Sequence, residues 1–106
     1  SNMETYFVHD KRLGIDIPRL EYDWDSYTEK DQSAILLRWE EIRGTIPDRV
    51  KELEGKINDK LSELNEEENF EKSCTLNDEI SELASCINDL WIYFRTNEEL
   101  TSKPHR

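Results

Sequence analysis

The side chains that could carry out catalysis are few and lie far apart in the sequence. The two histidines, His9 and His105, stand near opposite ends of the chain. The sequence has no Cys-x-x-Cys pair for zinc, no Glu-x-x-His pair for a di-iron centre and no glycine-rich phosphate loop. We therefore expect a protein that is not an enzyme and that has no catalytic residues, no cofactor and no metal ion.

The two cysteines, Cys74 and Cys86, are twelve residues apart in a segment with helical periodicity. A helix would hold them roughly 18 Å apart, whereas a disulfide needs Cα atoms within about 7 Å of each other. An internal disulfide is therefore excluded, and we expect small, half-buried apolar residues in a reducing compartment. A redox sensor at Cys74 would need a stabilised thiolate, which the acidic surroundings oppose.

Acidic side chains dominate the sequence and give it a formal net charge of −11. Residues 61–94 contain nine acids and one base, Lys72, whereas residues 1–60 contain fourteen acids and ten bases. Nucleic acids and anionic membranes repel such a chain, so we expect direct contact with neither, and a basic protein surface is the expected partner. The run 66–68 could bind a cation, although a solvated acidic turn is the simpler interpretation.

The composition indicates one domain with a thin core. The chain has 106 residues, of which 35% are hydrophobic and 37% charged, with three glycines and three prolines. Such a composition favours long amphipathic helices. Ser1-Asn2 before Met3 looks like the remainder of a cleaved expression tag, and neither a signal peptide nor an apolar run of about 18 residues follows. We expect a cytoplasmic protein.

A first helix is predicted over residues 28–43. Thr28 is a suitable N-cap, and Gly44 is a suitable residue for a helix stop. A second helix is predicted to begin almost at once, because Thr45 starts a capping-box pattern and Pro47 suits a first helical turn. Only one or two residues would join these helices. The apolar face of the first helix comprises Ile35, Leu36, Trp39 and Ile42.

The second helix, over residues 46–66, and a third, over residues 70–96, flank an acidic turn at 65–69. Each carries an apolar stripe at helical spacing, and the stripe of the third helix is a heptad repeat. The stripes are Ile46, Val50, Leu53, Ile57, Leu61 and Leu64, and Leu76, Ile80, Leu83, Ile87, Leu90 and Phe94. Two such helices should pack as an antiparallel, coiled-coil-like hairpin.

The predicted fold class is therefore all-α, with three helices in a helical domain over residues 28–98. A two-helix seam is rarely stable alone, so the first helix or a homodimer would supply a further layer. Residues 1–27 would form an N-terminal arm, either irregular or a small β-hairpin. Its aromatic side chains either cover the first helix or, through Trp24, anchor a partner. Residues 99–106 are expected to be a frayed tail.

The segment 70–83 resembles the UVR motif, a helical hairpin of excinuclease subunits B and C and of some Clp-associated proteins. The matching residues are Leu53-Glu54 upstream, then Phe70-Glu71, Asp78, Ile80 and Leu83. Ser73 and Cys74 replace two alanines with other small residues, whereas Asn77 replaces an arginine. The resemblance covers residues 50–85. It implies protein–protein docking, to another such hairpin or to itself, and no nuclease activity.

Phe70 is either an anchor exposed at the tip of the hairpin or a plug that closes the turn end of the seam. The expected function is a small, acidic, non-catalytic protein–protein interaction module, with self-association as one version. The alternative is an inhibitor that mimics nucleic acid, although basic residues interleave with the acids of the second helix. The predicted partner-binding residues are Phe70, Glu71, Lys72, Asp78, Glu79, Glu82 and Trp24.

Overall fold

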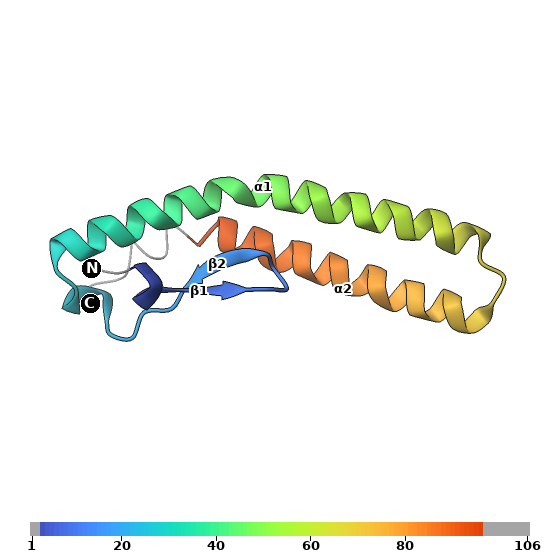
Figure 1. Cartoon of the computed structure of the whole chain (residues 1–106), viewed down its shortest axis with the longest axis horizontal. Helices are drawn as coiled ribbons and strands as arrows, with labels where there is room; N and C mark the ends of the chain where they lie inside the picture. Colours follow the sequence, from blue (N-terminus) through green and yellow to red (C-terminus); the bar gives the residue numbers. More distant parts are fainter. Residues whose placement is uncertain (1–2, 97–106) are drawn as a thin grey trace.

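The protein is an elongated molecule built on one helical hairpin (Figure 1). In the computed structural model, which describes residues 3–96, the Cα atoms extend over 59 × 28 × 20 Å. The two long helices run antiparallel along the longest axis, and a two-stranded sheet lies beside one end of the hairpin. The elements in chain order are η1 (Met3–Thr5), β1 (Phe7–Asp10), β2 (Ile15–Pro18), η2 (Trp24–Ser26), α1 (Glu29–Glu66) and α2 (Phe70–Phe94).

The predicted antiparallel helical hairpin is confirmed, and its turn lies within the predicted region 65–69. α1 ends at Glu66 and α2 begins at Phe70. Thr28 and Asn69 are the N-caps of the two helices. The side-chain oxygen of each accepts a hydrogen bond from the backbone N–H three residues further on, at 3.1 and 3.0 Å respectively.

The prediction of three helices is wrong. α1 is a single helix that continues through Gly44 and Pro47, where the first helix was expected to end and the second to begin. The physical reason is the spacing of its buried residues, which recur every three or four positions across this stretch, so one continuous helix places them all on one face. A break would turn part of this face out of the core. These buried residues are Ile35, Trp39, Ile42, Ile46, Val50 and Leu53.

Pro47 is accommodated inside α1 because it lies on the exposed side of the helix. A proline in a helix interior removes one backbone hydrogen bond and costs about 3 kcal/mol. Two residues earlier, the Thr45 hydroxyl donates to the Ile42 carbonyl at 2.7 Å, a contact that bends helices. Figure 1 shows α1 bowed over its partner helix, with the bend in the green middle of the ribbon.

The N-terminal arm contains the β-hairpin that the sequence allowed, so the expectation of an all-α fold is also wrong. β1 and β2 pair antiparallel, with Asp10 opposite Ile15 beside the turn. Gly14 closes this turn with a φ of 77°, and a Cβ atom there would lie 2.6 Å from Nε of Arg49. Both the backbone conformation and the close approach of α1 therefore favour glycine at this position.

The hydrophobic core occupies one end of the helical hairpin. We call residues 29–53 and 82–94 the proximal half, and residues 54–81 the distal half. The β-hairpin packs against the proximal half only. In the distal half Leu76 alone is buried. The main core cluster consists of Tyr6, Phe7, Leu13, Ile15, Ile35, Trp39, Ile42, Ile46, Val50, Leu53, Cys86 and Leu90.

α2 ends at Phe94, two residues before the predicted end of the third helix. The predicted frayed tail at 99–106 and the residues Ser1-Asn2 lie outside the described residues. Of the helices within residues 3–96, none is both long enough and apolar enough to cross a membrane.

Candidate protein-binding surface

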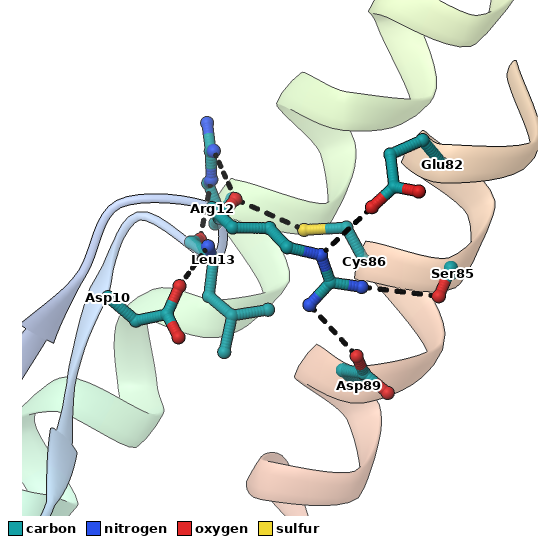
Figure 2. A network of polar contacts seen from close by, with 8 residues as sticks. Asp10, Arg12, Leu13, Glu82, Ser85, Cys86 and Asp89 are labelled. Carbon is teal, nitrogen blue, oxygen red and sulfur yellow. Dashed lines mark hydrogen bonds and ion pairs between the residues drawn. The ribbon is translucent and has the colours of Figure 1, made fainter. Parts of the chain in front are cut away.

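The turn of the β-hairpin is fixed to α2 through Arg12 (Figure 2). Its guanidinium donates to Glu82 and to Ser85, both at 3.2 Å, and forms an ion pair with Asp89 at 2.9 Å. Hydrogen bonds to Asp89 and then Glu82 raise the pKa of Arg12 above its ordinary value, so the side chain stays charged. We call Glu82, Ser85 and Asp89 the proximal cradle.

A second set of contacts holds the backbone of the same turn. The Cys86 thiol donates to the Arg12 carbonyl at 3.3 Å, and Nε of Arg49 in α1 donates to the Leu13 carbonyl at 2.8 Å. The turn is therefore tied to both helices. Burial raises the pKa of Cys86, so this thiol stays protonated and serves packing. The expectation of two half-buried cysteines is wrong, because Cys86 is buried and Cys74 is exposed, and both are free.

Phe70 is exposed at the tip of the hairpin. Its exposed fraction is 80%, so it does not plug the end of the seam. The reason is its position as the first residue of α2, directly after the N-cap Asn69, where the apolar stripe has not yet begun. Leu61 of α1, which was expected in the seam, is 42% exposed. The tip of the hairpin thus presents apolar side chains to solvent.

The charged residues of α2 that were predicted to bind a partner divide into two groups. Glu79 accepts from Lys60 of α1 at 3.1 Å, and Glu82 accepts from Arg12, so both hold the fold together. The other predicted charged residues of α2 are exposed and make no side-chain ion pair within residues 3–96. They are Glu71, Lys72 and Asp78. The first turn of α2 therefore carries most of the predicted residues that a partner could reach.

Trp24 lies at the other end of the molecule from Phe70. It is half-buried and packs against the proximal core, with its ring centroid 6.5 Å from that of Tyr27. The Tyr27 hydroxyl in turn accepts from two backbone N–H groups of the arm, at 3.0 and 3.1 Å. Trp24 and Tyr27 thus pack against the core, which was the simpler of the two interpretations, whereas Tyr22 is 64% exposed.

Arg12 and Arg49 are the polar residues that sequence reasoning missed. Arg12 contacts α2 about seventy positions away in the chain, and Arg49 contacts the turn 36 positions away. No periodicity connects residues at such separations. The turn signal around Gly14 was present in the sequence, but it does not indicate which helix the turn contacts.

The acidic side chains of the distal half are not gathered into a metal-binding group. Among residues 3–96, no group of three or more His, Cys, Asp or Glu side chains is arranged to hold a metal ion. A hollow of about 220 Å³ beside the β-hairpin is lined in part by His9, Asp16 and Arg38, on the proximal surface. What the tip can do chemically is form apolar contacts and accept hydrogen bonds from cations.

No family model matches the chain, and neither a curated protein nor a solved structure is significantly similar to it. The resemblance to the UVR motif therefore stays a prediction. Its apolar positions Ile80 and Leu83 are half-buried in the seam, whereas Cys74, at the place of an alanine, is exposed.

Proposed function

We propose that this protein is a small, acidic, non-catalytic protein–protein interaction module that docks through the distal half of its helical hairpin. The 80% exposed fraction of Phe70 carries the proposal. Aromatic side chains are enriched among the residues that dominate interface energies. Phe70 in this position contributes little to folding, so a contact with a partner is the simplest account of a large aromatic at the tip.

The charges at the C-terminal end of α1 support the same proposal, because they do not favour the stability of that helix. The last turn of α1 has no basic residue, although the helix dipole favours a cation there. Glu63 and Glu66 occupy this end instead, and Glu67 and Glu68 add like charges beside them. A helix end whose charges oppose its own dipole is more easily understood as a recognition surface than as a structural device.

The partner that fits such a surface is a protein with a basic patch around an apolar pocket. The UVR resemblance implies a related arrangement, in which the hairpin docks to another hairpin of this kind or to a second copy as a homodimer. A cytoplasmic setting remains part of the proposal. Direct contact with nucleic acid or with a membrane is not part of it, because the net charge of −11 opposes both.

The nucleic-acid mimic remains an alternative prediction that rests on charge alone. It does not account for the exposure of Phe70 or Leu61. In addition, Lys60 pairs with Glu79 across the seam and interrupts the row of acids. Competition with DNA for the same binding partner separates the two functions, because only a mimic would lose its partner to DNA in proportion to the DNA added.

The test is site-specific photo-cross-linking in a nuclease-treated extract of the source cells. A photoreactive side chain at position 70 should form a cross-link to one protein. The matched control is position 37, because Leu37 is also apolar, on the surface of α1, and 66% exposed. Position 37 lies in the proximal half and should give no such product.

Each outcome of the cross-linking experiment bears on docking through the distal half. A cross-link that forms equally from both positions, or from neither, contradicts docking through the distal half. A cross-link from position 70 to a second copy of the chain selects the homodimer among the versions of the proposal.

A further inference from the structure

The sequence of α2 contains an internal repeat that coincides with the proximal cradle. Residues 71–78 read Glu-Lys-Ser-Cys-Thr-Leu-Asn-Asp, and residues 82–89 read Glu-Leu-Ala-Ser-Cys-Ile-Asn-Asp. The two stretches share a glutamate, a small polar residue three positions later and an Asn-Asp pair at the end. Each member of the first stretch stands eleven positions before its counterpart in the second.

A shift of eleven residues preserves the face of a helix. Eleven residues make about three turns at 3.6 residues per turn, which leaves the two sets roughly 16 Å apart along the axis and about 20° apart around it. Glu71, Cys74 and Asp78 therefore stand on nearly the same face as Glu82, Ser85 and Asp89, in the same order and spacing. We call Glu71, Cys74 and Asp78 the distal cradle.

The structure shows what the proximal cradle binds, which is the guanidinium of an arginine. The three side chains of the proximal cradle all contact Arg12 (Figure 2). The three side chains of the distal cradle are exposed, and neither of its carboxylates makes an ion pair within the described part of the chain. The β-hairpin turn that delivers Arg12 does not extend into the distal half.

We propose that the distal cradle binds an arginine side chain presented by a loop or turn of another protein, as the proximal cradle binds Arg12. The inference rests on the proposed docking function and adds the chemistry of its partner. Phe70 stands immediately before Glu71, so an apolar pocket next to that arginine would take up the phenyl ring. Thr75 stands where Cys86 stands in the proximal repeat, but its hydroxyl donates to the Glu71 carbonyl of the same helix at 3.2 Å.

An arginine fits this arrangement better than a lysine. A guanidinium presents several N–H donors in one plane and reaches three acceptors at once, as Arg12 does, whereas an ammonium group is a point charge with no fixed fork. The source of the arginine is another protein and not a second copy, because each copy carries a net charge of −11 and nine acids against one base over residues 61–94.

The experiment is an NMR titration of the intact protein with methylguanidinium, with methylammonium as the matched probe of equal charge. We expect saturable shifts of the Glu71 and Asp78 signals with methylguanidinium and clearly smaller shifts with methylammonium. The E71Q/D78N double variant should raise the apparent Kd by about two- to fivefold, the range of an exposed ion pair. The Cys74→Ser variant, which copies the proximal cradle, should lower it.

Two control variants make the titration decisive. E66Q/E68Q removes the same charge from exposed positions of the tip outside the cradle and should leave the Kd within about twofold, since exposed charges act weakly at a distance. Arg12→Ala opens the proximal cradle, where the probe should then bind as well. Equal weakening by both double variants, or equal binding of both probes, would overturn the inference and reduce it to general attraction of cations.

The two proposals can fail separately. Absence of a cross-link from position 70 together with an intact titration would remove the docking function and leave the arginine site. A cross-link from position 70 together with a failed titration would leave the docking function and remove the arginine.

Discussion

The proximal and distal halves of the hairpin use the same two helices and the same seam, yet they differ in burial. In the proximal half the β-hairpin and the aromatic arm form a further layer, and residues such as Trp39 and Leu90 are fully buried. In the distal half no described element covers the seam, so Ile57 and Ile80 remain half-buried. A two-helix seam therefore becomes a core only where a third layer covers it.

The two halves also treat their charges differently. Arg12 neutralises acids of α2 in the proximal half, and its contacts fix the β-hairpin in place. The acids at the distal tip lie where the end of α1 disfavours them. Stability is thus concentrated at one end of the molecule, and the other end is the one that we propose for docking.

The largest expected effect is on the proximal core. Trp39→Ala should lower the free energy of unfolding by about 3–5 kcal/mol, because it removes a fully buried large side chain. Phe70→Ala should change it by no more than about 0.5 kcal/mol, because that ring is exposed. Urea unfolding followed by circular dichroism measures both.

If the Trp39 variant does not fold, Ile35→Val provides a milder test of the proximal core, with an expected loss of about 0.5–1.5 kcal/mol. A loss on Phe70→Ala as large as that on the core variant would contradict the division into two halves.

A smaller loss of stability is expected when the contact that joins the β-hairpin to α2 is removed. Arg12→Ala should destabilise the protein by about 1 kcal/mol, since its ion pairs are partly exposed and the backbone contacts of the turn remain. Amide hydrogen exchange should accelerate in β1 and β2 and stay unchanged in the distal half. Lys11→Ala, a neighbouring exposed residue of the same turn, is the control. Uniform acceleration over the whole chain would show that Arg12 does not act locally.

At the distal tip we expect changes of opposite sign. Glu66→Lys should raise the free energy of unfolding by about 0.3–1 kcal/mol, because it places a cation at the C-terminal end of α1. Glu71→Lys should lower it by a similar amount, because it replaces an acid in the first turn of α2. Thermal unfolding at low ionic strength measures both. Changes of the same sign would mean that net charge, and not the helix ends, controls stability at the tip.

The smallest expected effect is the pH dependence of the stability that Glu40 contributes. A hydrogen bond from Arg43 lowers the pKa of Glu40 below its ordinary value of 4.5. The ionised form is therefore favoured in the folded state, so this contribution to stability is present above about pH 4.5 and is lost as the pH falls through the lowered pKa. Glu40→Gln should be slightly less stable than the parent at pH 7 and equally stable at low pH. Glu54→Gln, at another exposed position of α1, should show no such convergence.

Much of the fold followed from local pattern. The apolar stripes predicted the two sides of the seam, the polar run predicted the turn at 65–69, and the strand-like runs allowed the β-hairpin. The predicted break in α1 was wrong because Gly44 and Pro47 are only local signals. The apolar stripe of α1 continues through both positions. The stripe prevails because burying Ile42, Ile46 and Val50 offsets a local cost of about 4 kcal/mol for one proline and one glycine.

The site was less predictable than the fold. The repeat in α2 is visible in the sequence, but its meaning depends on Arg12, which the sequence does not connect to α2. The exposure of Phe70 was one of two interpretations, and both fit the pattern. Helical periodicity specifies which residues share a face, but it does not specify which faces a third layer will cover.

The sequence alone was enough to predict the helical hairpin, its turn, the N-cap Thr28 and the strongly acidic distal end, because these depend on spacing and charge along a continuous stretch of chain. The tertiary structure adds that α1 is one helix, that the β-hairpin covers one half of the seam, and that Arg12 contacts Glu82, Ser85 and Asp89. These features arise from contacts between residues far apart in the chain, where the burial of apolar area and the reach of one side chain outweigh local preference.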